Sequence, residues 1–334
     1  MKFALTFLLT MLFGLAHTAQ AATWGGGTGN WVSDNWGLNA PDGSPGDATY
    51  TAEGAMITTG GVININPSDS IAVGNAVVFV NNGIINHSGG TASYGLRLDM
   101  RTQYNLSGGT LTDDGSTSWR VNSGGEYNIS GGSWSTTSAL LYQGSGLLNI
   151  TGGDVALGAI NMDDGTHTGT TVFRITGTSA GTLQALTTRL SPNTGGSSEA
   201  QFIFSDSGID AWTTQGGTGS LTLTTAGGSA DLVVDMANYS TAGVQNFTLF
   251  DYSTASGALA GTFGSIAVSS NANGAFTLGS DALSLTPGQY FIDYAAGDGS
   301  DIVLSANNFV IPEPSTLLLM GMSILAMCAF RGFR

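Results

Sequence analysis

The chain has 334 residues, a formal net charge of −15 at pH 7, 51 glycines and only 9% charged residues. Such an acidic chain lacks the basic face that nucleic acids and anionic lipids require, so we expect neither as a partner. The only cysteine, Cys328, lies near the C-terminus, so we expect no disulfide and no thiol chemistry in the body of the protein.

Residues 1–21 have the features of a secretory signal peptide. Lys2 provides a positively charged start, an apolar run extends from Phe3 to Ala16, and Ala19 and Ala21 supply the small residues of a cleavage site. This order predicts cleavage after Ala21 and export of the remaining chain. The mature body then has no lysine and contains five arginines before its C-terminal segment.

Residues 22–60 are expected to form an N-terminal cap. The segment contains Trp24-Gly25-Gly26-Gly27-Thr28-Gly29-Asn30-Trp31, then Asp34-Asn35-Trp36 and Pro45-Gly46-Asp47-Ala48. This glycine-rich, tryptophan-containing stretch resembles the start of autotransporter-associated β-strand repeat proteins. The resemblance implies a passenger-like β-helix whose end is covered by the segment.

Residues 61–200 contain an internal repeat. Four copies share an Asn, a Ser or Thr two residues later and then a Gly pair, and they begin at Ile85, Tyr104, Tyr127 and Leu148. Their Asn residues are 19, 23 and 21 positions apart, and residues 173–177 resemble a fifth, degenerate copy. A fixed period near twenty predicts a solenoid in which each repeat buries its apolar face against its neighbours.

Each repeat is predicted to be one coil of a parallel β-helix. Alternation along a strand places Tyr104, Ile129 and Leu148 inside and the Asn side chains outside. The Gly pair is expected to make a sharp bend before a second short strand. We expect Asn86, Asn105, Asn128 and Asn149 to form a stacked ladder. His87 replaces an apolar residue of the repeat, and we expect it to be partly exposed at a terminal coil.

Residues 201–305 are predicted to form the last coils and an antiparallel β cap. Short strands are expected at residues 201–204, 221–225, 231–235, 247–251, 276–278, 283–285, 289–294 and 302–305. The last two flank a Gly-Asp-Gly-Ser turn and therefore predict a hairpin. Fold class is thus all-β: a parallel β-helix with this cap, preceded by the signal peptide and followed by a single hydrophobic helix.

Residues 306–334 resemble the PEP-CTERM sorting signal of Gram-negative, biofilm-forming bacteria. They contain Pro312, Glu313 and Pro314, then an apolar run from Leu317 to Phe330, then Arg331 and Arg334. The two arginines are expected to remain cytoplasmic and stop translocation. The resemblance implies processing near Pro-Glu-Pro by exosortase, after transient anchoring in the inner membrane.

Few residues have the pattern of a catalytic or metal site. Asp163, Asp164 and His167 form one candidate for calcium binding or acid–base catalysis, and Asp298 with Asp301 forms another. A further acidic pair is Asp113 with Asp114. Each pair adjoins or contains Gly, which also indicates simple turn chemistry. We therefore expect no cofactor and no metal, with calcium as the open alternative.

Three arginines, Arg97, Arg101 and Arg120, lie in or near the repeats. They are expected to pair with Asp99, Asp113 or Asp114 along the outer face, or to bind an anionic sugar.

The sequence as a whole predicts a non-enzymatic surface or extracellular protein that is structural or adhesive. Exosortase is the expected processing partner, and exopolysaccharide of a biofilm matrix is the expected associated material. Two alternatives remain open: a β-helix polysaccharide lyase or hydrolase, and a self-assembling adhesin.

Overall fold

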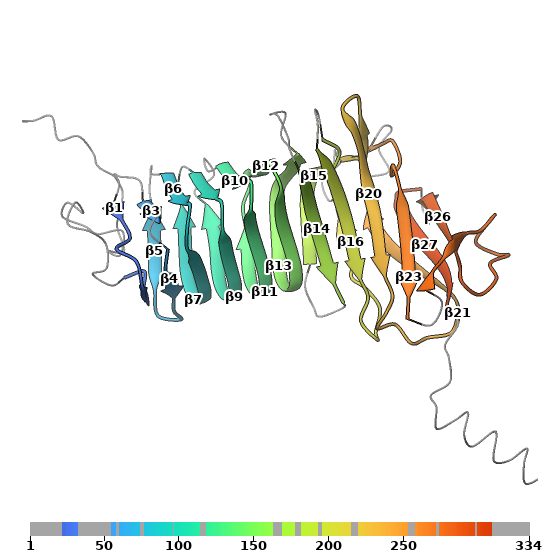
Figure 1. Cartoon of the computed structure of the whole chain (residues 1–334), viewed down its shortest axis with the longest axis horizontal. Coiled ribbons are helices and arrows are strands. Elements are labelled where there is room, and N and C mark those ends of the chain that lie inside the picture. Colours follow the sequence, from blue (N-terminus) through green and yellow to red (C-terminus); the bar gives the residue numbers. More distant parts are fainter. Residues whose placement is uncertain are drawn as a thin grey trace, which may run out of the picture.

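The computed structural model describes residues 22–32, 55–57, 60–73, 77–95, 97–113, 118–162, 169–177, 182–192, 196–214, 220–252, 258–271, 274–297 and 299–308. These residues form strands and turns and contain no helix, so the all-β prediction is confirmed for them. The strands belong to one large mixed sheet. From β1 to β20 they follow one another approximately in chain order along the longest axis of the molecule, and β21 to β27 lie together at its C-terminal end (Figure 1).

Most strands stack in three ladders of parallel hydrogen bonds, which the chain visits in turn. In β7 (Ile84–Tyr94) and β9 (Gln103–Asp113), for example, Asn86 lies opposite Asn105 in the first ladder and Thr91 opposite Thr110 in the second. The next strand after β7 along the chain, β8 (Arg97–Met100), belongs to the third ladder. Residues one repeat apart therefore become lateral neighbours.

The first ladder contains β2 (Thr28–Asn30), β4 (Val62–Ile65), β7, β9, β11 (Gly125–Ser135), β13 (Gly146–Met162), β14 (Thr170–Thr176), β16 (Ser197–Ile203), β20 (Gly228–Asp235) and β23 (Ile266–Ser270). The second contains β5 (Ser70–Val73), the later parts of β7, β9, β11 and β13, then β15 (Thr182–Arg189), β17 (Trp212–Thr213) and β21 (Gly243–Asp251). The third contains β1 (Ala22–Thr23), β3 (Ala55–Ile57), β6 (Val77–Val80), β8, β10 (Ser118–Asn122), β12 (Ala139–Gln143), the ends of β13 and β15, β18 (Ser220–Thr222) and β22 (Leu259–Ala260).

The Gly pair of each repeat bends a strand without ending it. β9 continues through Gly108 and Gly109, although the sequence predicted two separate short strands here. The register with neighbouring strands shifts at this point, and Gly109 has a φ of 78°. Only glycine adopts this conformation without strain, so the pair turns the strand from the first ladder into the second.

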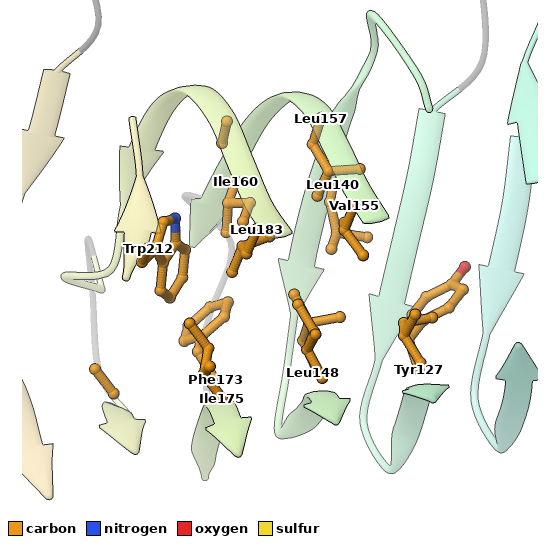
Figure 2. Close-up of a cluster of buried hydrophobic side chains, with 14 of the residues drawn as sticks. Tyr127, Leu140, Leu148, Val155, Leu157, Ile160, Phe173, Ile175, Leu183 and Trp212 are labelled. Atoms are coloured by element: carbon orange, nitrogen blue, oxygen red, sulfur yellow. The ribbon is translucent and has the colours of Figure 1, made fainter. Parts of the chain in front are cut away.

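The core lies between the ladders and is built from their inward-facing columns. Tyr104, Ile129 and Leu148 are 0%, 1% and 1% exposed, as the alternation predicted. In one column Leu98, Trp119, Leu140 and Ile160 stack at successive levels. Figure 2 shows side chains of this core projecting into the space that the strands enclose. Each fully buried Leu or Ile contributes about 1.5–3 kcal/mol to folding.

Aromatic rings form a continuous chain inside this core. The ring centroids of Tyr94 and Trp119 are 5.8 Å apart, those of Trp119 and Trp134 are 5.2 Å apart, and those of Trp134 and Tyr127 are 4.8 Å apart. Tyr104 follows at 5.8 Å from Tyr127. Edge-to-face and offset pairs at such distances add stability beyond the area they bury. The rings therefore link several levels of the stack.

The expected partial exposure of His87 is wrong, because the side chain is fully buried. It lies in an inward column between Ile65 and Leu106, and its Nδ1 is 3.0 Å from the Tyr104 hydroxyl, with which it shares a hydrogen bond. Further levels of the stack exist on both sides, since β4 and then β2 lie on one side of β7 and β9 lies on the other. His87 is therefore not at the end of the stack, where it would have been exposed.

The predicted hairpin near the C-terminus is confirmed. β26 (Gln289–Ala296) and β27 (Asp301–Asn308) pair antiparallel, and the other edge of β27 pairs antiparallel with β21. Three short strands complete this region: β19 (Thr224–Thr225), β24 (Gly274–Ala275) and β25 (Thr277–Leu278). At the end of β27 the buried Asn308 donates through Nδ2 to the carbonyls of Tyr239 and Thr241, at 3.0 and 3.4 Å.

The strand predicted at residues 283–285 is absent, and a turn occupies this position. Asp281 explains the difference, because its Oδ1 accepts hydrogen bonds from the backbone N–H groups of Leu283 and Ser284 at 2.8 and 2.9 Å. Its Oδ2 accepts a third from the Ser284 hydroxyl. Such local bonds compete with a strand ladder for the backbone donors.

Replacing His87 with Leu is expected to reduce the acid sensitivity of the fold. Burial lowers the pKa of His87 below its ordinary value of 6.5, although backbone hydrogen bonds to Gly90 and Gly89 and the charge of Asp69 raise it in part. A lowered pKa favours the neutral form, so its contribution to stability is complete above pH 6.5 and is lost as pH falls below that value. Urea unfolding of both proteins at pH about 7.5 and about 5.5 measures this. If both proteins lost the same unfolding free energy between the two pH values, the lowered pKa of His87 would be contradicted.

Replacing Gly109 with Ala is expected to destabilise the protein far more than replacing Gly27 with Ala. The two glycines have matching φ angles of 78° and 77°. A Cβ on Gly109 would lie 2.5 Å from the Gly89 carbonyl carbon, whereas one on Gly27 would meet nothing within 4 Å. Gly27→Ala should therefore cost only the left-handed backbone penalty of about 1–2 kcal/mol. Urea midpoints of the two variants provide the comparison, and similar values would disprove the close stacking.

Candidate functional site

Five asparagines form a hydrogen-bonded ladder on the outer face of the first ladder of strands. Asn86 donates through Nδ2 to Asn64 Oδ1 at 3.4 Å, and Asn105 donates to Asn86 at 2.8 Å. Asn128 donates to Asn105, and Asn149 to Asn128, each at 3.2 Å. The expected ladder is thus confirmed and extends one level further, to Asn64. All five side chains are half-buried.

The ladder leaves hydrogen-bonding capacity on each amide. A side-chain amide has two N–H donors and two acceptor lone pairs on its oxygen. Asn105, in the middle, uses one donor toward Asn86 and one lone pair toward Asn128. Every bond runs in the same direction, from a later level to an earlier one. Asn149 ends the series, because its register partner in β14 is Arg174, which donates to Gln201 Oε1 at 2.7 Å instead.

Hydroxyl groups form a second row beside the amides. Ser88, Ser107, Ser130 and Thr151 each follow a ladder Asn by two residues, and each donates to a carbonyl of the preceding level at 3.2–3.5 Å. Beyond the Gly pairs, Ser133 Oγ donates to Thr110 Oγ1 at 3.4 Å and Thr91 Oγ1 to Ser70 Oγ at 3.2 Å. The outer face therefore carries a row of neutral polar groups that repeats from level to level.

A shallow groove lies next to the amide ladder, at the N-terminal ends of the strands that carry the asparagines. Its volume is about 440 Å³, and residues from four successive levels line it: Gly60, Gly61, Val62, Asn82, Gly83, Ile84, Thr102, Gln103, Gly124 and Glu126. Gln103 donates through Nε2 to Glu126 Oε2 at 3.4 Å. Neither Gln103 nor Glu126 was predicted as a site residue from the sequence. Aligning the repeats would have found them, because each precedes its ladder Asn by two positions.

Of the acidic and arginine pairs considered from sequence, one is present in the described part of the chain. Arg97 Nη2 lies 3.0 Å from Asp99 Oδ2. Asp113 instead accepts a hydrogen bond from Trp119 Nε1 at 3.3 Å and another from the Thr136 hydroxyl. This carboxylate therefore holds β10 and the end of β11 together.

The structure brings together one pair that the sequence did not predict, Asp301 and Asp251. These residues lie opposite each other on β27 and β21, and both are half-buried.

The remaining predicted site residues lie outside the described residues. They are Asp163, Asp164, His167 and Asp298 among the calcium or acid–base candidates, and Asp114 beside Asp113. The signal-cleavage residues Ala19 and Ala21 also lie outside, as do Pro312, Glu313, Pro314, Arg331 and Arg334.

Neither a metal-binding cluster nor a membrane-spanning helix is present in the described residues. They contain no group of three or more His, Cys, Asp or Glu side chains arranged to hold a metal ion. They also contain no helix with the length and apolar character to cross a membrane. The apolar run at residues 317–330 lies outside the described residues.

Comparison with known proteins identifies the C-terminal segment. The PEP-CTERM protein-sorting motif matches residues 310–334. This motif implies export to the cell envelope or surface, with exosortase as the processing partner. No curated protein and no solved structure matches the chain, so the resemblance of its body to autotransporter-associated repeat proteins stays a prediction.

Replacing Asn128 with Ala is expected to cost about twice as much stability as replacing Asn149 with Ala. Asn128 takes part in two ladder bonds and Asn149 in one. With about 0.5–1.5 kcal/mol for each bond, the expected losses are about 1–3 and about 0.5–1.5 kcal/mol. Urea unfolding measures both, and hydrogen exchange of β9 and β11 amides shows where the loss occurs. Equal effects would mean that the ladder bonds contribute little.

Proposed function

We propose that this protein is an exported, non-enzymatic structural or adhesive component of the cell surface or extracellular matrix, associated with exopolysaccharide. Exosortase would process it at Pro312-Glu313-Pro314 after the signal peptide has been removed. While the segment Leu317 to Phe330 spans the inner membrane, Arg331 and Arg334 would remain on the cytoplasmic side. The proposal joins the sorting motif at residues 310–334 to the polar outer face of the body.

We propose further that the body is a parallel β-helix. Support comes from the order of the strands. β7, β9 and β11 each run through the first ladder and then the second, and β8 and β10, which connect them, lie in the third. Each passage through all three ladders returns the chain to the same column one level further along. The antiparallel strands β21, β26 and β27 would then cap the C-terminal end and protect its edge.

The observation that carries a contact function is the repeating row of neutral amides and hydroxyls on the outer face. Its groups repeat at every level of the first ladder, from Asn64 to Asn149. Parallel strands are spaced about 4.8 Å apart, so the face offers hydrogen-bonding groups at a regular interval along the long axis. A linear polysaccharide, with its repeated hydroxyl groups, is a suitable partner for such a face.

The chemistry of this face favours contact over catalysis. Amide and alcohol side chains hydrogen-bond sugar hydroxyl groups, but they do not titrate near neutral pH and so do not act as general acids or bases. No cofactor is part of the proposal, and a role for calcium would rest on Asp163, Asp164 and His167 or on Asp298 and Asp301.

The sorting step is tested by replacing Pro312, Glu313 and Pro314 with Ala in the full-length chain in its native host. We expect the variant to accumulate in the inner membrane with its C-terminal segment attached, because the processing motif is gone. Fractionation locates the protein, and intact mass determines its C-terminus. A conservative control, Ser315→Ala, should be processed normally. Release of a correctly shortened triple variant would disprove processing at this motif.

The contact role is tested with the mature protein isolated from the host. It should cosediment with at least one neutral or acidic polysaccharide and leave the length of the polymer unchanged. Appearance of new reducing ends or unsaturated uronic ends would instead establish a lyase or hydrolase. Failure to bind any polysaccharide, together with concentration-dependent assembly of the protein alone, would favour a self-assembling adhesin.

A further inference from the structure

Three of the five arginines of the body gather around one carboxylate on the outer side of the third ladder. Arg97 and Asp99 lie on β8, Arg101 directly follows that strand, and Arg120 lies on β10 as the register partner of Asp99. Parallel strands are about 4.8 Å apart, so the Arg120 and Asp99 backbones are immediate neighbours. We call these four residues the arginine cluster.

The members of the arginine cluster differ in how far their charge is already neutralised. Arg97 forms the ion pair with Asp99 at 3.0 Å, and Asp99 is 4% exposed. Arg120 donates through Nη1 to a neutral amide, Gln143 Oε1, at a long 3.4 Å. Arg101 is exposed. Burial raises the pKa of the Asp99 carboxyl, while the positive charges of Arg97, Arg120 and Arg101 each lower it in part.

The cluster is an exception in the charge distribution of the chain. With Asp99 ionised, its net charge is 3 − 1 = +2, whereas the whole chain carries −15. Between positions 190 and 308 there are ten acidic residues and no Arg or Lys. An acidic protein that uses so few cations has no need to concentrate three of them for solubility. A local positive field on a negative surface steers an anionic group to that position.

We propose that Arg101 and Arg120 form a binding site for the carboxylate of a uronate-containing extracellular glycan, an assignment that rests on the proposed contact function. A guanidinium presents a planar fork of N–H donors that matches a carboxylate and binds it through two parallel hydrogen bonds. Arg97 is held by Asp99 and acts as a positioning residue. Asp99 in turn limits the net positive charge, so the glycan is held reversibly.

The groove begins next to Arg101 and extends away from the arginine cluster. Thr102 and Gln103, which line the groove, follow Arg101 immediately in the chain. A glycan whose carboxylate sits at Arg101 can therefore continue into the groove and reach the amides of Gln103 and Asn82. Glu126 lines the same groove and repels a second carboxylate there. The ligand is consequently held through one uronate at the arginines, while the sugars that follow contact the groove through their hydroxyl groups.

The decisive comparison uses two double variants with the same change in charge. In the mature protein, Arg101→Gln with Arg120→Gln removes the site, and Arg174→Gln with Arg189→Gln removes two arginines elsewhere. We measure binding of a purified oligogalacturonate and of a neutral dextran oligomer at low and at physiological ionic strength. The site variant should bind oligogalacturonate at least about tenfold more weakly and lose the salt dependence, because two charge-assisted contacts are gone. The control variant should bind like the wild type.

Two single variants refine the assignment. Arg101→Lys keeps the charge but not the planar fork, and it should lie between the wild type and the double variant. Asp99→Asn should bind oligogalacturonate more tightly than the wild type, since it removes the negative charge inside the cluster. Hydrogen exchange of β8 and β10 amides confirms that each variant keeps its fold. Arg101 is exposed, so Arg101→Gln alone serves if the double variant unfolds.

The possible failures have separate meanings. Equal losses in the two double variants would overturn the site and leave only a general charge effect. Binding of dextran without oligogalacturonate would also overturn it, while the proposed contact function would stand. If neither glycan binds, the site is disproved, and the contact function is decided by the cosedimentation test with other polysaccharides. If the wild type instead self-associates without glycan, and the site variant does not, the cluster binds the acidic part of a second copy of this chain and the glycan assignment is wrong.

Discussion

The structure depends on the parallel, in-register stacking of equivalent residues. When a repeat returns to the same column, each side chain is flanked above and below by the residue of the same repeat position. An apolar position then becomes a core column, as for Leu98, Trp119 and Leu140. An Asn position becomes a row of amides that satisfy one another. Stacking also brings backbones together at the Gly pairs, where a Cβ would collide with the level below. One constraint thus accounts for the core, the outer face and the glycines.

The outer face links this constraint to the proposed function. The interior needs only apolar residues of compatible size, so the sequence of the outer columns is free to vary without loss of the fold. This chain has used that freedom in two ways. From Asn64 to Asn149 the first ladder carries a side-chain amide at every level, and the third carries a local concentration of arginines around Asp99. A rigid scaffold with separately adjustable faces suits a protein that acts by contact.

The sequence predicted the structure correctly wherever strand alternation or the alignment of the repeats decides where a residue lies. It placed Tyr104, Ile129 and Leu148 inside, the Asn ladder outside and the C-terminal hairpin in its correct position. The prediction failed where packing against a neighbouring level of the stack decides the environment of a residue. The burial of His87 depends on β4 packing next to β7, and the groove exists only because four levels lie side by side. Residues 283–285 form a turn because the Asp281 side chain binds their backbone, which β propensity does not register. The acid–base candidates Asp163, Asp164, His167 and Asp298 stay predictions.

The hydrogen bonds of the Asn308 side chain affect how the protein resists a pulling force. This residue is the last one before the segment that leads to the sorting motif, so a pull on that segment reaches the fold here first. β27 is flanked by hydrogen-bonded strands on both edges, and the Asn308 side chain is itself tied to the carbonyls of Tyr239 and Thr241. The strain is therefore spread at once over β21, β26 and the loop after β20. A body tethered through its C-terminal segment in flowing water would thus resist peeling from its attached end.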